Sequence, residues 1–342
     1  MIPRFFSCSV PECGRPNVRG LVAAIAVTAT LKFLETTAVP APRAFAYGVC
    51  GNGMDHDVGV SFLRMEELPG RPWVGQGVSG GNATKQENTK IWNGLADIMA
   101  ELEKHPFPKA GSLCCQSSKI EVSAMASDRF IVPDLEGPFD TAVAYHSAYA
   151  EQYLSLIADG QLYIEYPVDA YLVYRFLKDN AAQLVEQGAK GQAPGQFFLK
   201  HADDKGDHLL VDENLNITGI IDWQMARIVP RREAFGPSLV TAEMNALCGG
   251  RVSLSDDDTV LADALKTRGV DGGATDEKAR RFFWGLALEP KWEYALPLAD
   301  ARLEVFGVGQ EWMVWREVAL REYEADERLQ ALVRDYSRRE QE

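Results

Sequence analysis

Residues 197–226 read FFLKHADDKGDHLLVDENLNITGIIDWQMA, and this stretch decides the fold of the chain. Two short apolar runs, at 209–211 and 217–221, flank the polar turn DENLN and predict an antiparallel hairpin. In such a hairpin the end of the second strand lies beside the start of the first, about 5 Å away. We therefore expect Asp222, which follows the second strand, to lie beside the charged loop that precedes the first strand.

The charged loop before the hairpin, KHADDKGD at 200–207, is rich in ionisable side chains. Together with the residues that follow it, four carboxylates and two imidazoles converge on one end of the hairpin: Asp203, Asp204, Asp207, Asp222, His201 and His208. Like charges this close are costly unless a cation neutralises them, which favours a divalent metal site. The alternative is a hydrated acidic loop, because Asp, Lys and Gly are common in surface turns. A calcium loop of the EF-hand type is excluded, because Ile217 stands where that loop needs Gly.

The same stretch resembles the aminoglycoside phosphotransferase family, which has a protein-kinase-like fold. Kinase-like enzymes carry His-x-Asp, an Asn five residues after the Asp, and a hairpin that ends in a metal-binding Asp. The corresponding residues here are His201 and Asp203, His208 at the Asn position, and Asp222. The string GIIDW is typical of the family, and the whole stretch resembles its fungal branch.

Two further segments resemble the family in the expected order and at the expected spacing. FLRMEELPGRPW at 62–73 resembles the hinge between the lobes, and AVPAPRAFAYG at 38–48 resembles the end of the N-lobe helix and the strand after it. The resemblance implies a bilobal α+β fold of the protein-kinase type. A small, incomplete, β-containing N-lobe and the hinge would occupy residues 1–70. A large, mainly helical C-lobe that carries the catalytic hairpin would occupy residues 71–342.

The resemblance also implies a role for each residue of the site. Asp203 would accept the proton of a substrate hydroxyl or orient that hydroxyl for in-line attack on the γ-phosphate of ATP (or GTP). His201 would hold the catalytic loop. Asp222 would bind the Mg²⁺ that bridges the phosphates, and Asp207 and His208 complete the predicted metal set.

The hinge residues Glu66, Glu67 and Leu68 would hydrogen-bond the edge of the adenine through their backbone. The resemblance therefore implies an ATP-dependent phosphotransferase that acts on a hydroxyl group of a small molecule. A protein kinase fits less well, because no A-P-E segment follows Asp222 and IDW stands where D-F-G would be.

Several departures from the family pattern leave a second function open, a catalytically inactive kinase-fold protein that binds or regulates. His208 replaces the usual Asn, and imidazole is a poorer ligand than oxygen for Mg²⁺. Val27 stands where the N-lobe helix normally supplies a Glu. The chain also begins late, so the strand that bears a basic residue is expected to be largely missing, with Arg4 the one early candidate. Either the true start lies upstream, or the N-lobe has been lost.

Composition narrows the classes of partner. The 342 residues carry a formal net charge of −14, which argues against a sequence-independent nucleic-acid binder and would suit a cationic acceptor. Six cysteines form no C-x-x-C pair and indicate free thiols in a reducing compartment. The apolar run at 21–31 is of the length found in secretory signals, but it continues as a helix and is too short to span a bilayer. We expect a cytoplasmic monomer with no membrane partner.

Apolar periodicity predicts the main elements around the hairpin. Helices are expected at 91–104, 141–157, 169–186 and 312–339, and strands at 43–49, 58–65 and 197–199. Acceptor contacts are sought after Trp223 and among the carboxylates of the middle helices, Glu151, Glu165 and Asp169, although an ordinary surface role is favoured for each of these three.

Overall fold

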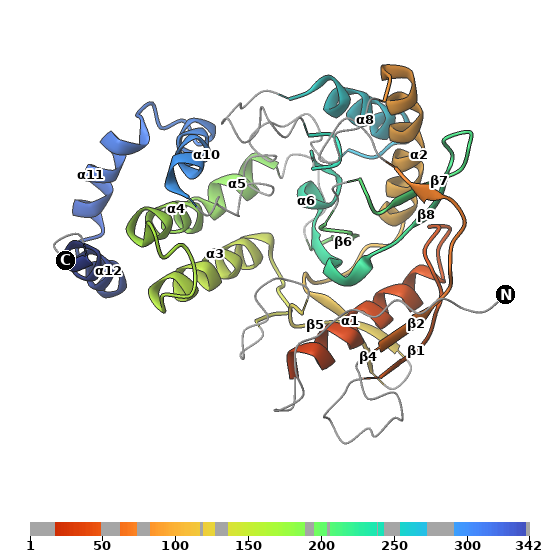
Figure 1. The fold of residues 1–342 in the computed structure, drawn as a ribbon, viewed down its shortest axis with the longest axis horizontal. Helices are drawn as coiled ribbons and strands as arrows, with labels where there is room; N and C mark the ends of the chain where they lie inside the picture. Colours follow the sequence, from red (N-terminus) through yellow and green to blue (C-terminus); the bar gives the residue numbers. More distant parts are fainter. Residues whose placement is uncertain are drawn as a thin grey trace.

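The computed structural model describes residues 18–48, 62–73, 83–116, 119–126, 136–188, 195–203, 206–237, 239–242, 254–271 and 291–339. Helix α1 (Val18–Leu34) and the ribbon of β1 (Ala44–Gly48) and β2 (Phe62–Met65) lie together at one end of the molecule, and the last helices lie at the other (Figure 1). The catalytic hairpin lies between these ends. Its surroundings are built from four small sheets and the helices that cover them.

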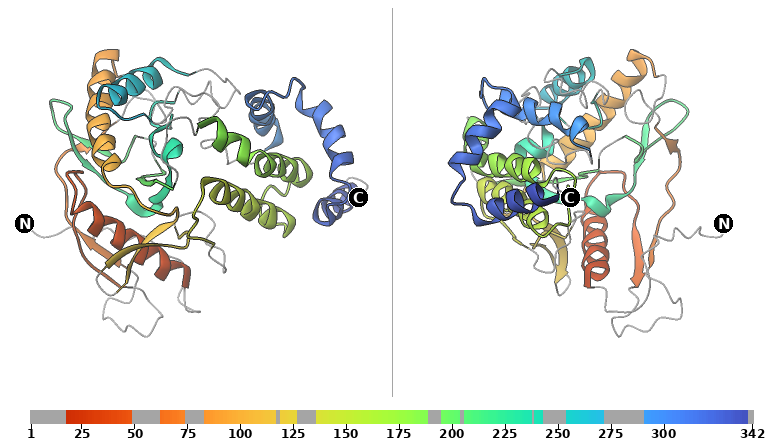
Figure 2. Two further views of the ribbon diagram at one scale, coloured as in Figure 1. Left: turned by 180° about the vertical axis from the view of Figure 1, so that it is seen from behind. Right: turned by 60° about the vertical axis from the view of Figure 1, so that its left-hand side comes forward.

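Helix α1 and the β1–β2 ribbon form the N-terminal part of the fold. The helix is apolar along most of its length and packs against β1, β4 (Ser112–Gln116) and η1 (Trp223–Met225). The right-hand view of Figure 2 shows the helix beside the strands of the ribbon. It ends where the hydroxyls of Thr36 and Thr37 bond the last carbonyls of the helix. The helix and the strand predicted at 43–49 are confirmed. The strand predicted at 58–65 is present as β2, and residues 58–61 lie outside the described part.

The predicted hairpin is confirmed as β7 (Leu209–Val211) and β8 (Ile217–Ile220), paired in antiparallel register with Leu209 opposite Ile220. Its turn is held by one side chain, because Asp212 Oδ1 accepts hydrogen bonds from the backbone N–H groups of Asn214 and Asn216 at 2.8 Å each. These bonds, with that from the Asn216 backbone the strongest, lower the pKa of Asp212.

A third strand, β3 (Arg71–Pro72), pairs with β7 and joins the hinge to the hairpin. The hinge is also bonded directly to β8, because Thr218 Oγ1 donates to the carbonyl of Pro69 at 2.6 Å. The segment that precedes the ribbon in the sequence is bonded to β8 as well, because the Ile220 N–H donates to the carbonyl of Pro40 at 2.7 Å. The segments on both sides of the β1–β2 ribbon are therefore hydrogen-bonded to the same strand.

The core behind the hairpin combines one sheet with two long helices. Strand β6 (Phe197–Lys200) leads into the catalytic loop and pairs with β9 (Arg227–Pro230), which is followed by α6 (Arg231–Phe235). Helix α2 (Lys85–Glu103) lies across β6 and β8 and packs on α8 (Asp256–Thr267), and strand β5 (Lys119–Ser123) pairs with β4. Helix α2 starts at a capping box in which Thr84 and Glu87 bond each other's backbone N–H groups. The helix predicted at 91–104 and the strand at 197–199 are confirmed.

The C-terminal half is helical: α3 (Ala142–Ala158), α4 (Pro167–Asp179), α5 (Ala181–Gly188), α10 (Trp292–Val305), α11 (Trp312–Glu322) and α12 (Glu327–Arg339). We call these helices the C-terminal bundle. Aromatic rings fill its interior, and Tyr153 stacks on Tyr174 with 4.1 Å between ring centroids. None of the helices in the described ranges has the length and apolar character needed to cross a membrane.

Two helices that the sequence predicts as continuous are each broken in two. The expected helix at 169–186 is interrupted at Asn180, whose side chain turns back to bond the Phe176 carbonyl. The expected helix at 312–339 is interrupted before Asp326, whose carboxylate caps α12 by accepting the N–H groups of Arg328 and Leu329. The prediction was wrong at both points because the apolar stripe continues through each break, while the polar side chain fixes the end of the helix.

Candidate active site

His201 connects the catalytic loop to the end of the hairpin. Its backbone carbonyl accepts the Asp203 N–H at 2.9 Å, and its ring Nε2 lies 2.8 Å from the carbonyl of Ile221. Because a carbonyl only accepts hydrogen bonds, Nε2 must carry the proton in this contact. Ala202 between them adopts a left-handed backbone with φ 65°, an uncommon conformation for a residue with a side chain. One residue therefore fixes both the loop that carries Asp203 and the residue before Asp222.

His208 lies against His201. The two rings are nearly parallel, with 4.0 Å between centroids and 17° between planes, and both residues are buried. The His208 carbonyl accepts the Ile221 N–H at 3.0 Å. The two histidines thus hold both backbone groups of Ile221.

Asp222 and Asp207 stand at the same end of the hairpin. The β7–β8 register places residue 207 opposite residue 222, although Asp222 itself departs from the strand into a left-handed conformation with φ 66°. Both residues are exposed. Asp207 Oδ1 lies 4.0 Å from Nδ1 of His208, which is beyond hydrogen-bond length.

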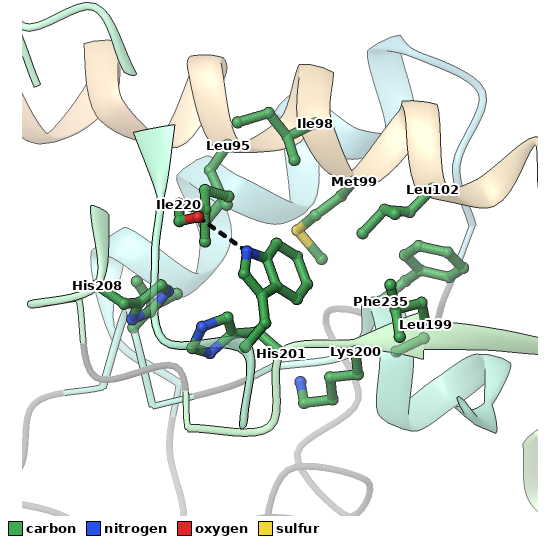
Figure 3. A pocket seen from close by; sticks show the side chains of 13 residues that line it. Leu95, Ile98, Met99, Leu102, Leu199, Lys200, His201, His208, Ile220 and Phe235 are labelled. Atoms are coloured by element: carbon green, nitrogen blue, oxygen red, sulfur yellow. Dashed lines mark hydrogen bonds between the residues drawn. The ribbon is translucent and has the colours of Figure 1, made fainter. Parts of the chain in front are cut away.

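Behind the histidines lies a small cavity of about 50 Å³ with apolar walls. Leu95, Ile98 and Met99 of α2 line one side of this space, and His201 and His208 line another (Figure 3). The indole of Trp223 lines it too, packs edge-on against His201 with 4.9 Å between centroids, and donates to the Ile220 carbonyl at 2.8 Å. The catalytic loop therefore rests on an apolar support, while the carboxylates at 207 and 222 face outward.

The hinge differs in one respect from what the sequence predicts for adenine binding. The Glu66 N–H donates to the carbonyl of Arg43 at 2.9 Å, and the Glu66 carboxylate pairs with the Arg43 guanidinium at 3.2 Å. The Glu66 N–H is thus engaged within the β1–β2 ribbon. Leu68 packs onto β8 at Gly219, where a Cβ would come within 2.6 Å of Leu68 Cδ1.

The structure brings together His201, Asp203, Asp207, His208 and Asp222, while Asp204 lies outside the described residues. Within the described ranges, no group of three or more His, Cys, Asp or Glu side chains is placed to hold a metal ion. Magnesium is usually bound by one or two carboxylates together with phosphate oxygens and water, so the residues at the hairpin end are compatible with this ion. Elsewhere in the predicted set, Val27 packs partly buried against the core, and Arg4 lies outside the described part of the chain.

Sequence reasoning missed the contribution of Trp223 and Gly219. Two of the carboxylates considered for acceptor contacts, for which an ordinary role was favoured, have structural partners. Asp169 accepts hydrogen bonds from Trp312 Nε1 and Arg316 Nε at 2.8 Å each, and Glu151 pairs with Lys178 and Arg328. Both therefore hold the C-terminal bundle together. Trp223 could have been found from its place directly after Asp222, because an aromatic residue beside a strand end commonly packs beneath the turn.

The fold and the site together define the class of protein. A β1–β2 ribbon with its helix, a hinge strand and a helical half that carries the catalytic hairpin make up an α+β, protein-kinase-like fold. The model of the APH phosphotransferase enzyme family matches residues 16–249, more than half of the chain. The chain belongs to this family.

Solved structures of aminoglycoside phosphotransferases resemble the chain at low identity. A thermostable variant of aminoglycoside phosphotransferase APH(4)-Ia, in ternary complex with AMP-PNP and hygromycin B, is 13% identical over 83% of this chain and 84% of that chain, with a TM-score of 0.47. The aminoglycoside phosphotransferase of Alicyclobacillus acidocaldarius subsp. acidocaldarius DSM 446 is 14% identical over 95% of this chain and 85% of that chain, with a TM-score of 0.36. No curated protein matches the chain.

Proposed function

We propose that the protein is an ATP-dependent phosphotransferase that acts on a hydroxyl group of a small molecule. The observation that carries the proposal is the position of His201, whose carbonyl bonds the Asp203 N–H and whose ring bonds the Ile221 carbonyl. A transfer site needs a proton acceptor for the attacking hydroxyl and a charge-neutralising centre for the phosphates, held in fixed relation. His201 supplies that fixed relation between Asp203 and Asp222.

Asp203 is the group that receives the proton. In the transfer, the acceptor oxygen forms a bond to the γ-phosphorus while the bond from that phosphorus to the β,γ-bridging oxygen breaks. The hydroxyl proton passes to the Asp203 carboxylate, and the products are a phosphate ester and ADP. The transition state is loose, so positioning and charge stabilisation supply most of the rate.

A magnesium ion fits the hairpin end in a particular way. Mg²⁺ prefers oxygen ligands and is usually bound by one or two carboxylates, with phosphate oxygens and water completing its shell. The exposed carboxylates of Asp222 and Asp207 match this description. When bound with the nucleotide, the ion would neutralise charge on the phosphates.

The hinge would hold the base of the nucleotide through the backbone of residues 66–68, with ATP or GTP as the donor. Since the Glu66 N–H is engaged by Arg43, we assign the contact to the Glu66 carbonyl and to the backbone of Glu67 and Leu68. The packing of Leu68 on Gly219 keeps this segment directly beside the strand that ends in Asp222. The acceptor is a small hydroxyl compound, and the net charge of −14 suits a cationic one.

Thermal unfolding tests this proposal without knowledge of the acceptor. ATP at a hundred times its dissociation constant stabilises the folded state by about 2.7 kcal/mol, so the melting temperature should rise when ATP is added with Mg²⁺ or Mn²⁺. The Asp222→Ala variant should lose the metal-dependent part of this shift. Cooperative melting with no shift under any of these conditions would refute the proposal and favour a kinase-fold protein that binds another partner.

A further inference from the structure

His208 stands at the sequence position where a metal-ligating side chain is expected, yet its ring lies elsewhere. It is 5% exposed and stacks on His201, which is 8% exposed, with 4.0 Å between ring centroids. At this separation and at 17° between planes, the two ring faces are in van der Waals contact. The ring also lines the apolar cavity under α2, on the inner side of the loop (Figure 3).

The His208 backbone and the His201 ring on which His208 stacks both contact Ile221. His208 accepts the Ile221 N–H through its carbonyl at 3.0 Å, and the ring that it packs against approaches the Ile221 carbonyl at 2.8 Å. Ile221 is followed at once by Asp222, whose left-handed conformation is populated only when the surroundings fix it. Removing the His208 ring would take away the face on which the His201 imidazole stacks and leave the edge contact with Trp223.

The ring and the nearby carboxylates differ in exposure. The exposed carboxylates at the hairpin end belong to Asp207 and Asp222, and the Asp207 side chain is 64% exposed. The His208 ring, whose Nδ1 lies 4.0 Å from Asp207 Oδ1, is buried and stacked on His201. Magnesium prefers oxygen ligands, so a bond to the His208 imidazole would add little binding free energy.

We propose that His208 is a positioning residue, which fixes Asp222 through its stack on His201 and its bond to Ile221, and that it does not ligate the metal. This inference rests on the proposed function, because it assigns a duty within the same site. It predicts that the aromatic ring of His208 matters for metal-dependent nucleotide binding and that its nitrogen atoms do not bind the ion.

Two substitutions at His208 distinguish a role in packing from a role as a metal ligand. His208→Phe keeps a flat ring but has no metal-binding atom, whereas His208→Ala removes both. The measurement is the Mn²⁺ concentration at half-saturation for binding of a fluorescent ATP analogue, with kcat and KM for ATP hydrolysis as a second readout. Loss of a group that orients a metal ligand commonly costs about 10- to 100-fold in metal affinity or activity, and we expect His208→Ala to show this loss while His208→Phe stays close to the unchanged protein.

The control is His105→Phe, the same change at a histidine at the end of α2 that lies apart from the site. It should leave the Mn²⁺ midpoint unchanged. Equal loss of metal affinity in His208→Phe and His208→Ala, with both variants folded, would overturn the proposal and make the ring a ligand.

A third measurement keeps the inference separate from the proposed function. The coupling free energy between positions 201 and 208 can be obtained from urea unfolding of His201→Ala, His208→Ala and the double variant. A non-zero coupling free energy is expected. Strictly additive losses of unfolding free energy in the two single variants would show that the two rings do not stabilise each other and would overturn the proposal. If the unchanged protein binds no metal–nucleotide complex, the proposed function fails, while this coupling still reports on the stack.

Discussion

Carboxylates are used in opposite ways in the C-terminal bundle and at the end of the β7–β8 hairpin. In the bundle, half-buried carboxylates are bonded through their own oxygens. Asp326 accepts the hydroxyl of Tyr171 and a guanidinium N–H of Arg175, both at 3.0 Å, and Asp169 accepts the indole of Trp312. At the hairpin, Asp207 and Asp222 are exposed, and the residue before Asp222 is held through its backbone.

The difference separates structural acids from chemical ones. An acid that is to bind a cation or accept a proton must stay accessible to the substrate, and at the hairpin end the residue before the exposed Asp222 is fixed through its backbone. An acid that stabilises helix packing gives its oxygens to neighbouring donors. On this criterion Glu151 and Asp169 belong to the architecture, in line with the ordinary role that the sequence analysis favoured for them.

The largest effect is expected at the hairpin, from Asp203→Asn. The amide cannot accept the hydroxyl proton, so turnover should fall about 10³-fold, within the range for loss of a general base. Nucleotide affinity should be unchanged, because Asp203 contacts the acceptor side of the reaction. If this variant keeps its turnover, Asp203 is not the proton acceptor. The proposed difference between the acids of the hairpin and those of the bundle would then fail.

The next effect is expected in the bundle, from Asp326→Ala. The change removes the cap of α12 and leaves the buried Tyr171 hydroxyl and the half-buried Arg175 without this acceptor, so the free energy of unfolding should fall by about 3 kcal/mol in urea titrations. Nucleotide binding below the unfolding transition should stay as it was. Asp335→Ala, an exposed position of the same helix, is the control and should change stability by less than about 0.5 kcal/mol. A loss of nucleotide affinity in Asp326→Ala would show that the two regions are coupled.

A buried histidine of the bundle allows a test by pH. Burial, and next the charge of Arg227, lower the pKa of His146 from 6.5 to about 3. Over this pH range His146 is protonated in the unfolded chain and neutral in the folded chain. The free energy of unfolding therefore decreases as the pH falls from about 6.5 toward 3. Between pH 6.5 and pH 5 this amounts to about 2 kcal/mol. His146→Leu should flatten that part of the pH profile in urea unfolding, and an unchanged slope would contradict the assignment.

The smallest effect is expected where the hinge meets the hairpin, from Gly219→Ala. The added Cβ would lie 2.6 Å from Leu68 Cδ1, so Leu68 must move and stability should fall by about 1.5 kcal/mol. Because Leu68 belongs to the segment proposed to hold the base, the dissociation constant of the nucleotide should rise as well. Gly309→Ala, where nothing lies within 4 Å of the new atom, should leave both quantities unchanged. A stability loss with no change in affinity would separate Leu68 from nucleotide binding.

Local sequence signals predicted the hairpin and its surroundings well. The turn at 212–216 forms because Asp212 can bond two backbone N–H groups within its own loop, which needs no distant partner. The kinase-like order of elements followed from the same stretch and from the hinge. The two missed helix breaks have a different cause, because at Asn180 and Asp326 a single polar side chain overrides an apolar stripe that continues on both sides.

The direction of the His208 ring could not be read from the sequence at all. The position of His208, five residues after Asp203, places its backbone beside Ile221, and the structure confirms that much. Whether the ring then turns outward to the acids or inward to His201 depends on the space under α2, which is shaped by residues about a hundred positions away such as Leu95. The roles of the acids themselves stay predictions.

The attachment of the β1–β2 ribbon to β8 also determines how the ribbon can move. In the described chain, its two flanking segments are hydrogen-bonded to β8 at Ile220 and Thr218, two residues apart on one strand. Helix α1 holds the ribbon as well, because it packs against β1 and also against β4 and η1. The ribbon is therefore anchored to β8 by hydrogen bonds of its two flanking segments and to the neighbouring elements through α1. A shift of the ribbon relative to β8 would break the bonds at Thr218 and Ile220, which lie four and two residues before Asp222.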